Sequence, residues 1–163
     1  ERTRMRDAVS AVAAELQAEQ SQPQKLPLVT VGALAGAMVG AAAWAALAIF
    51  GNIEFGLVAV AVGFLAGVGA KFAAGKARGQ SFQIATAASA AVGLLAGKYF
   101  TFAHYMAEAM AARGLEVMIW SPDLIAAFAG ALGGMLSPFD ALWFFLALSS
   151  AWKALAPSAV DVR

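Results

Sequence analysis

The chain has 163 residues, of which 61% are hydrophobic and 13% are charged, and its formal net charge is +1. Soluble domains are about 45–50% apolar and about 25% charged, so a water-soluble globular fold is excluded and lipid must solvate much of the surface. The near-neutral charge gives no sign of nucleic-acid binding, and the lack of cysteine excludes disulfides, thiolate metal sites and cysteine nucleophiles.

Residues 1–25 are expected to form an amphipathic helix on the cytoplasmic side, followed by a polar linker. Met5, Val9, Val12 and Leu16 follow the three-and-four spacing of one helix face. This face is narrow and rich in alanine, which favours a helix at the membrane surface or against a partner domain over one that inserts into lipid. Because the chain does not begin with methionine, we expect a fragment or a processed form. Whether a further domain precedes residue 1 stays open.

The clearest predicted span covers residues 28–50, which carry no charge. At about 1.5 Å of rise per residue, a helix of this length crosses a hydrocarbon layer of about 30 Å. Pro27 stands just before it, at a position in the first helical turn where a missing N–H costs little. We therefore expect a transmembrane helix that ends at the turn of residues 51–56, whose glycines and asparagine suit a tight connection.

Further apolar segments predict three more spans, which makes four in all. The second covers residues 55–72, and the third begins near Phe82 and continues as a helix to Gly114. The basic segment 71–80 between them is predicted to be a loop. The last span covers residues 141–156 and is rich in aromatic residues.

Residues 121–136 are predicted to form an interfacial helix on the outer side, before the last span. Ser121 is a good helix cap, Pro122 suits the first turn, and Asp123 lies near the positive end of the helix dipole. The segment is shorter than the roughly 20 residues that a crossing needs. The predicted fold is therefore an all-α integral membrane protein, with residues 1–25 in the cytoplasm, a four-helix transmembrane domain over 26–157 and a C-terminal tail over 158–163.

The distribution of basic residues predicts the orientation. With four crossings, both termini and the 71–80 loop share one side, and that side collects most of the lysine and arginine. Lys98 and Arg113 are the cations left on the other side, which also collects most of the acids outside the N-terminal helix. Lysine and arginine are retained in the cytoplasm, so we expect both termini there.

Small residues recur at every fourth position in three of the predicted spans. Residues four apart share a helix face, and helices in lipid associate by close packing because lipid tails supply no hydrophobic drive between them. Two interpretations stay open: packing within one chain, or packing of one face against a neighbouring subunit. The predicted helix-packing residues are Gly32, Gly36 and Gly40, then Gly63 and Gly67, and then Ala85, Ser89, Gly93 and Gly97.

Few polar residues are candidates for chemistry. His104 and Glu108 share a helix face and predict a polar pair at the membrane surface. A zinc site needs three or four ligands, and the chain has one histidine. Glu54 and Lys98 are the charges that a pore or an interface near the outer surface would use. No catalytic, cofactor-binding or metal-binding motif is present, so we expect neither enzymatic activity nor a cofactor.

Two segments have a distinctive pattern. GNIEFGLVAVAVGFLAGVGAKFAAGK places a glycine-containing turn before a G-F-L span, and LSPFDALWFFLALSSAWK places a Ser-Pro-x-Asp start before an aromatic span that ends with a basic residue. Between about Gly32 and Lys153 the chain resembles an uncharacterised family of small bacterial multi-pass membrane proteins, although Asn52 and Phe55 depart from its turn. The resemblance implies a fold in the bacterial inner membrane and implies no activity.

The predicted function is structural: a small membrane scaffold or accessory subunit that packs through small-residue faces, with itself or within a larger complex. The alternative is a small oligomeric channel or transporter for an ion or small solute. A scaffold buries its glycine faces in dry contacts, whereas a pore places Thr30, Thr86 or Ser89 along a wet path. The sequence does not choose whether lipid, pigment, quinone or a partner faces the aromatic residues Trp120, Trp143, Phe144 and Phe145.

Overall fold

The computed structural model describes residues 2–51 and 56–157, and these residues form helices and no strand. The all-helical prediction is therefore confirmed for this part of the chain. Glu54 and the predicted tail 158–163 lie outside the described residues. The elements are α1 (Arg2–Gln20), the short 3-10 helix η1 (Pro23–Lys25), α2 (Leu26–Gly51), α3 (Leu57–Ala74), α4 (Gln80–Ala111), α5 (Pro122–Met135) and α6 (Pro138–Ala154).

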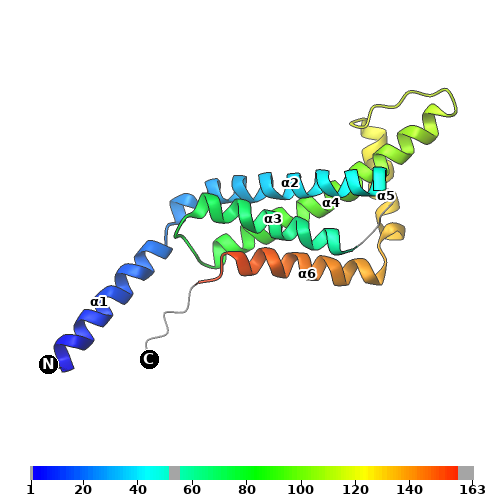
Figure 1. Ribbon diagram of the computed structural model, residues 1–163. Coiled ribbons are helices and arrows are strands. Elements are labelled where there is room, and N and C mark those ends of the chain that lie inside the picture. Colours follow the sequence, from blue (N-terminus) through cyan, green and yellow to red (C-terminus); the bar gives the residue numbers. More distant parts are fainter. Residues whose placement is uncertain (1, 52–55, 158–163) are drawn as a thin grey trace.

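Helices α2, α3, α4 and α6 form a bundle in which consecutive members run in opposite directions (Figure 1). Helices α3 and α4 each contact the three other members of the bundle. Its core is built mostly of alanine, with a few larger side chains such as Val62 and Leu94 that are fully buried. Small core residues let the helix axes approach closely, and the bundle is correspondingly slender.

Three helical stretches of the described chain are long and apolar enough to cross a membrane, and they contain α2, α3 and α4. Helices α5 and α6 are separated by a short break and bent by 104° relative to each other, and the number is four if this pair is one span. Helix α6 alone has 17 residues, which is about 25 Å of helix.

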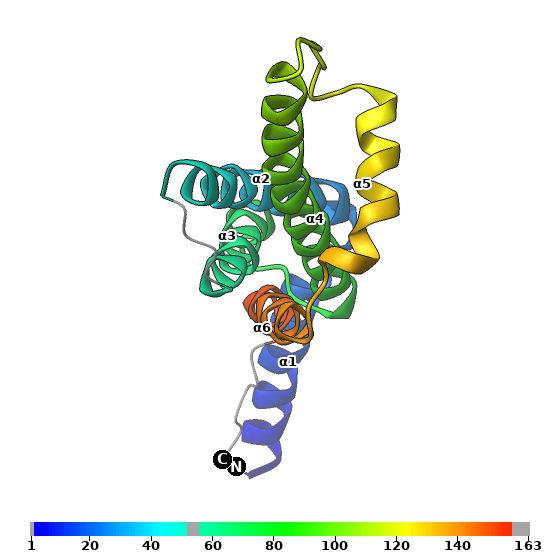
Figure 2. The ribbon, with the colours of Figure 1, turned by 90° about the vertical axis from the view of Figure 1, so that its right-hand side faces the viewer.

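Two helices lie outside the bundle. Helix α1 projects away from it (Figure 1) and has no buried residue, so the predicted apolar face with Met5, Val9 and Val12 is exposed. Helix α5 runs beside the C-terminal half of α4, which extends past the bundle (Figure 2). The predicted helix over 121–136 is thus present as α5.

The predicted start of the loop after α3 is wrong by a few residues. The segment 71–80 is a loop only from Gly75, because α3 continues to Ala74 before Gly75 takes a positive φ of 60°. The side chain of Lys25 donates a hydrogen bond to the carbonyl oxygen of Ala74 at 3.3 Å, which satisfies an acceptor at that helix end. The last helix begins at Pro138 with Ser137 as its cap, so the Ser-Pro-x-Asp start seen in the sequence is present, and the apolar run from residue 141 lies inside this helix.

The glycines of α2 lie directly against α3. A Cβ built on Gly36 would overlap the carbonyl oxygen of Leu65, and one on Gly32 would lie 2.5 Å from the carbonyl oxygen of Gly69. A Cβ on Gly40 would lie 2.8 Å from a backbone atom of α3. Real side chains do not make such short contacts, so these helices touch through their backbones. Gly69 was not among the residues singled out in the sequence, which placed Gly63 and Gly67 on the packing face of this span.

Gly63 and Gly67 instead lie against α6. A Cβ on Gly63 would overlap the carbonyl of Ala147, and one on Gly67 would lie 2.7 Å from the Cβ of Ala154. Helix α3 therefore presents two glycine faces, one to α2 and one to α6.

The small face of α4 lies against α2. A Cβ on Gly93 would lie 2.7 Å from the Cβ of Ala37, and one on Gly97 would lie 3.4 Å from the Trp44 ring. Ser89 is 3% exposed. Each of the small-residue faces identified in the sequence thus meets another helix of the same chain.

Replacement of Gly36 by leucine is expected to destabilise the bundle, since any side chain there overlaps the α3 backbone. Overpacking of this kind costs about 1–3 kcal/mol, and thermal unfolding in mild detergent measures it. The matched control is Gly133→Leu, because a Cβ at Gly133 meets no atom within 4 Å. Equal melting temperatures for the two variants would contradict the backbone contact.

Candidate functional site

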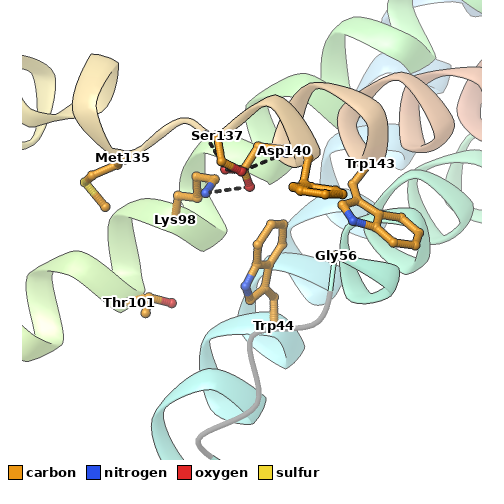
Figure 3. Close-up of a pocket in the computed structure, with 9 residues that line it drawn as sticks. Trp44, Gly56, Lys98, Thr101, Met135, Ser137, Asp140 and Trp143 are labelled. Carbon is orange, nitrogen blue, oxygen red and sulfur yellow. Dashed lines mark hydrogen bonds and ion pairs between the residues drawn. The ribbon is translucent and has the colours of Figure 1, made fainter.

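A cleft of about 480 Å³ opens at the end of the bundle where α5 turns into α6 (Figure 3). Helices α2, α4, α5 and α6 contribute residues to this cleft, and α3 contributes through its N-cap residue, Gly56. Its walls combine two indole rings with one ion pair. The lining residues are Trp44, Gly56, Lys98, Thr101, Met135, Ser137, Phe139, Asp140 and Trp143.

The ion pair joins Lys98 of α4 to Asp140 in the first turn of α6. The Nζ of Lys98 lies 3.0 Å from the Oδ1 of Asp140, and the two side chains are 13% and 22% exposed. Attraction between charges is stronger where water is largely excluded than at an open surface. The pair therefore fixes the start of α6 against the middle of α4 (Figure 3).

The other carboxylate oxygen of Asp140 caps its own helix. Its Oδ2 accepts hydrogen bonds from the backbone N–H of Ser137 at 2.8 Å and from the Ser137 hydroxyl at 3.0 Å. In return, the N–H of Asp140 donates to the Ser137 hydroxyl at 3.2 Å. This reciprocal arrangement is a capping box. One carboxylate thus both starts α6 and neutralises Lys98.

Aromatic rings surround the ammonium group of Lys98. Its Nζ lies 5.9 Å from the ring centroids of both Trp44 and Phe144, within the range of a cation–π interaction. On the far wall, Trp143 lies directly over Gly56, where a Cβ would overlap the indole. Gly56 is therefore needed for the indole to reach this position.

The polar side chains of the cleft already have bonding partners within the protein. Lys98 and Asp140 neutralise each other, and the hydroxyl of Thr101 donates to the carbonyl oxygen of Gly97 at 3.0 Å. A general base or a nucleophile needs a group that is free to react with substrate. The arrangement is suited to holding helices together and to packing an apolar or aromatic group against the indoles.

The other sequence candidates lie outside this cleft. His104 and Glu108 face each other on α4 with their side-chain atoms 4.0 Å apart, and their side chains are 46% and 73% exposed. Among residues 2–51 and 56–157, no three His, Cys, Asp or Glu side chains are grouped to hold a metal ion. Trp120 and Phe145 are exposed, and Trp120 packs edge-on against Phe100.

Polar side chains inside the bundle bond to the backbone. Thr86 is fully buried and donates to the carbonyl oxygen of Phe82 at 2.7 Å, and Ser89 donates to that of Ala85 at 2.8 Å. Gln83 reaches across to α6 and donates to the carbonyl oxygen of Trp152 at 3.1 Å. Within the described ranges, no buried side-chain nitrogen or oxygen is left without a partner.

Sequence reasoning assigned Lys98 to this end of the molecule but did not find its partner. The orientation argument placed both Lys98 and Asp140 on the outer side, together with several other acids. The Ser-Pro-x-Asp start of the last span was also recognised in the sequence as a capping signal. That signal singles out Asp140 as an oriented carboxylate at the start of the last helix, and it could have identified the pair. Trp44, Gly56 and Met135 gave no such signal.

Removal of one partner of the ion pair is expected to destabilise the protein more than removal of both. Lys98→Met leaves the Asp140 carboxylate without its counter-charge. Likewise, Asp140→Asn leaves the Lys98 ammonium group without its counter-charge. A double-mutant cycle on detergent unfolding is expected to give a coupling free energy of about 1–3 kcal/mol. The matched control is the exposed pair Lys76 and Glu19, for which we expect about 0–1 kcal/mol. Strict additivity at Lys98 and Asp140 would show that the pair contributes nothing.

Comparisons with models of protein families, with curated proteins and with solved structures give no match for this chain.

Proposed function

We propose that the chain is a bacterial inner-membrane protein with four spans, in which α6 is the last crossing and both termini are cytoplasmic. Five of its cations belong to the end of the bundle where α3 and α6 terminate and where α2 and α4 begin. Because basic residues are retained on the cytoplasmic side of a membrane, this clustering supports an orientation with that end of the bundle in the cytoplasm. The resemblance to uncharacterised small bacterial membrane proteins belongs to the same proposal. The cations are Lys25, Lys71, Lys76, Arg78 and Lys153.

Within that membrane the protein acts as a scaffold or accessory subunit. The observation that carries this proposal is that the polar side chains of the bundle already have partners: Thr86 and Ser89 are buried and bonded to their own helix, and Lys98 is neutralised by Asp140. Conduction or coupled transport requires polar or charged groups that face a hydrated path. The interior therefore favours a scaffold over the channel that is its alternative, and the function is assigned to the surface of the protein.

The surface proposed for the partner is the open face of α5. A Cβ on Gly130, Gly133 or Gly134 would meet no atom within 4 Å, in contrast to the glycines of the bundle spans. The opposite face of α5 is anchored, since Leu124 and Phe128 are buried and Phe128 packs edge-on against Tyr99 of α4. Helices in lipid pack closely where small residues allow it, and α5 offers such a surface on a fixed support.

Replacement of Gly130 and Gly134 together by leucine is expected to abolish assembly without loss of stability, because the bundle does not use these positions. Native mass spectrometry and sizing in mild detergent measure the assembly, and thermal unfolding measures the stability. The control is Val39→Leu on α2, an exposed apolar position that adds bulk outside α5.

An unchanged assembly in the α5 variant would remove that face from the proposal. A wild-type chain that is monomeric and partner-free in native membranes would overturn the scaffold function itself.

A further inference from the structure

A small groove lies between the ends of α3 and α6, apart from the cleft described above. It has a volume of about 210 Å³. Helices α3 and α6 run side by side in the same direction, so their C-terminal ends meet at one end of the bundle (Figure 1). The groove is lined by Phe64, Gly67, Val68 and Lys71 of α3 and by Ser150, Lys153 and Ala154 of α6.

The two lysines of the groove differ from the other cations at this end. Lys25 donates to the carbonyl oxygen of Ala74 at 3.3 Å, Lys76 lies 3.2 Å from a carboxylate oxygen of Glu19, and Arg78 donates to the carbonyl oxygen of Gly75 at 2.7 Å. These three cations therefore have partners in the chain.

Lys71 and Lys153 have no such partner in the part of the chain that the structure describes. Both are exposed, and neither makes an ion pair within residues 2–51 and 56–157. They line the same groove from two different helices. Two ammonium groups that lack a partner among the described residues line one groove, which favours an anionic occupant.

The groove changes from apolar to cationic along the helix axis. Phe64, Gly67 and Lys71 follow a spacing of three and four, which places them on one face of α3. At about 1.5 Å per residue, Lys71 lies about 10 Å further along the helix than Phe64. Across the groove, Ser150 adds a hydroxyl beside Lys153, three residues away on α6. An anionic phospholipid has the same order, from acyl chain to phosphate.

We propose that this groove binds one anionic phospholipid. Its phosphate contacts Lys71, Lys153 and the hydroxyl of Ser150, and the first part of one acyl chain lies along Phe64 and Val68. The volume suits the phosphate and glycerol groups, while the rest of the acyl chains stays in the bilayer. Basic pockets between spans on the cytoplasmic side bind anionic headgroups in this way. The inference rests on the proposed membrane insertion and orientation.

Native mass spectrometry of the full chain in mild detergent tests the site. The probes are phosphatidylglycerol, phosphatidylcholine with the same acyl chains, and glycerol 3-phosphate. One phosphatidylglycerol is expected to bind in preference to phosphatidylcholine, and glycerol 3-phosphate is not expected to bind. Lys71→Gln with Lys153→Gln should weaken phosphatidylglycerol binding about 30-fold, the effect of two basic residues near an anionic lipid. The matched control Lys76→Gln, at the same end but paired with Glu19, should leave binding unchanged.

Equal binding of the two lipids, or an unchanged affinity in the double lysine variant, would overturn the site. Binding of glycerol 3-phosphate as tight as that of the lipid would show an anion site without a lipid role. A second variant, Phe64→Ala, removes an exposed side chain and should weaken lipid binding without lowering the melting temperature. Carbonate extraction of membranes separates the two proposals: a released wild-type chain contradicts membrane insertion, whereas a retained chain without lipid preference contradicts the groove alone.

Discussion

Contact between the backbones of α2 and α3 determines how the rest of the bundle is built. At Gly32, Gly36 and Gly69 no side chain separates the two helices, so carbonyl oxygens of one helix lie against the backbone of the other. In lipid such close packing replaces the hydrophobic drive that holds soluble bundles together. With α2 held on one face, α3 uses Gly63 on another face to receive α6. Helix α3 therefore packs against two neighbours through two different glycine faces.

The two ends of the bundle differ in how their charges are placed. At the end where α3 terminates, hydrogen bonds to backbone carbonyls join segments far apart in sequence, such as Lys25 to Ala74 and the N–H of Gly79 to the carbonyl of Leu155. At the other end a charge pair, Lys98 with Asp140, works among aromatic rings. The first end keeps free cations at its surface, whereas the second has its partly buried charges neutralised. This asymmetry follows from the sequence, in which most basic residues fall at one end of the bundle helices.

Hydropathy and capping signals predicted the helices well, because these signals are local. The uncharged run 28–50 could form little but a long apolar helix, and Ser137 with Asp140 marked the true start of α6 better than the apolar run did. Which faces meet is a different matter. A glycine at every fourth position shows that a face can pack closely, but it does not name the neighbour, and Gly69 carried no distinguishing pattern. The Lys98 partner had to be chosen among several acids, and only the folded arrangement brings Asp140 to it.

The double use of Asp140 links the order of synthesis to the burial of charge. Lys98 is made 42 residues before the carboxylate that neutralises it, so a nascent chain holds a lone ammonium near the bundle until the last helix emerges. The same carboxylate also fixes where that helix begins. The contact of α6 with α3 and α4 therefore goes together with the counter-charge of Lys98, because one residue at the start of α6 provides both the cap and the carboxylate.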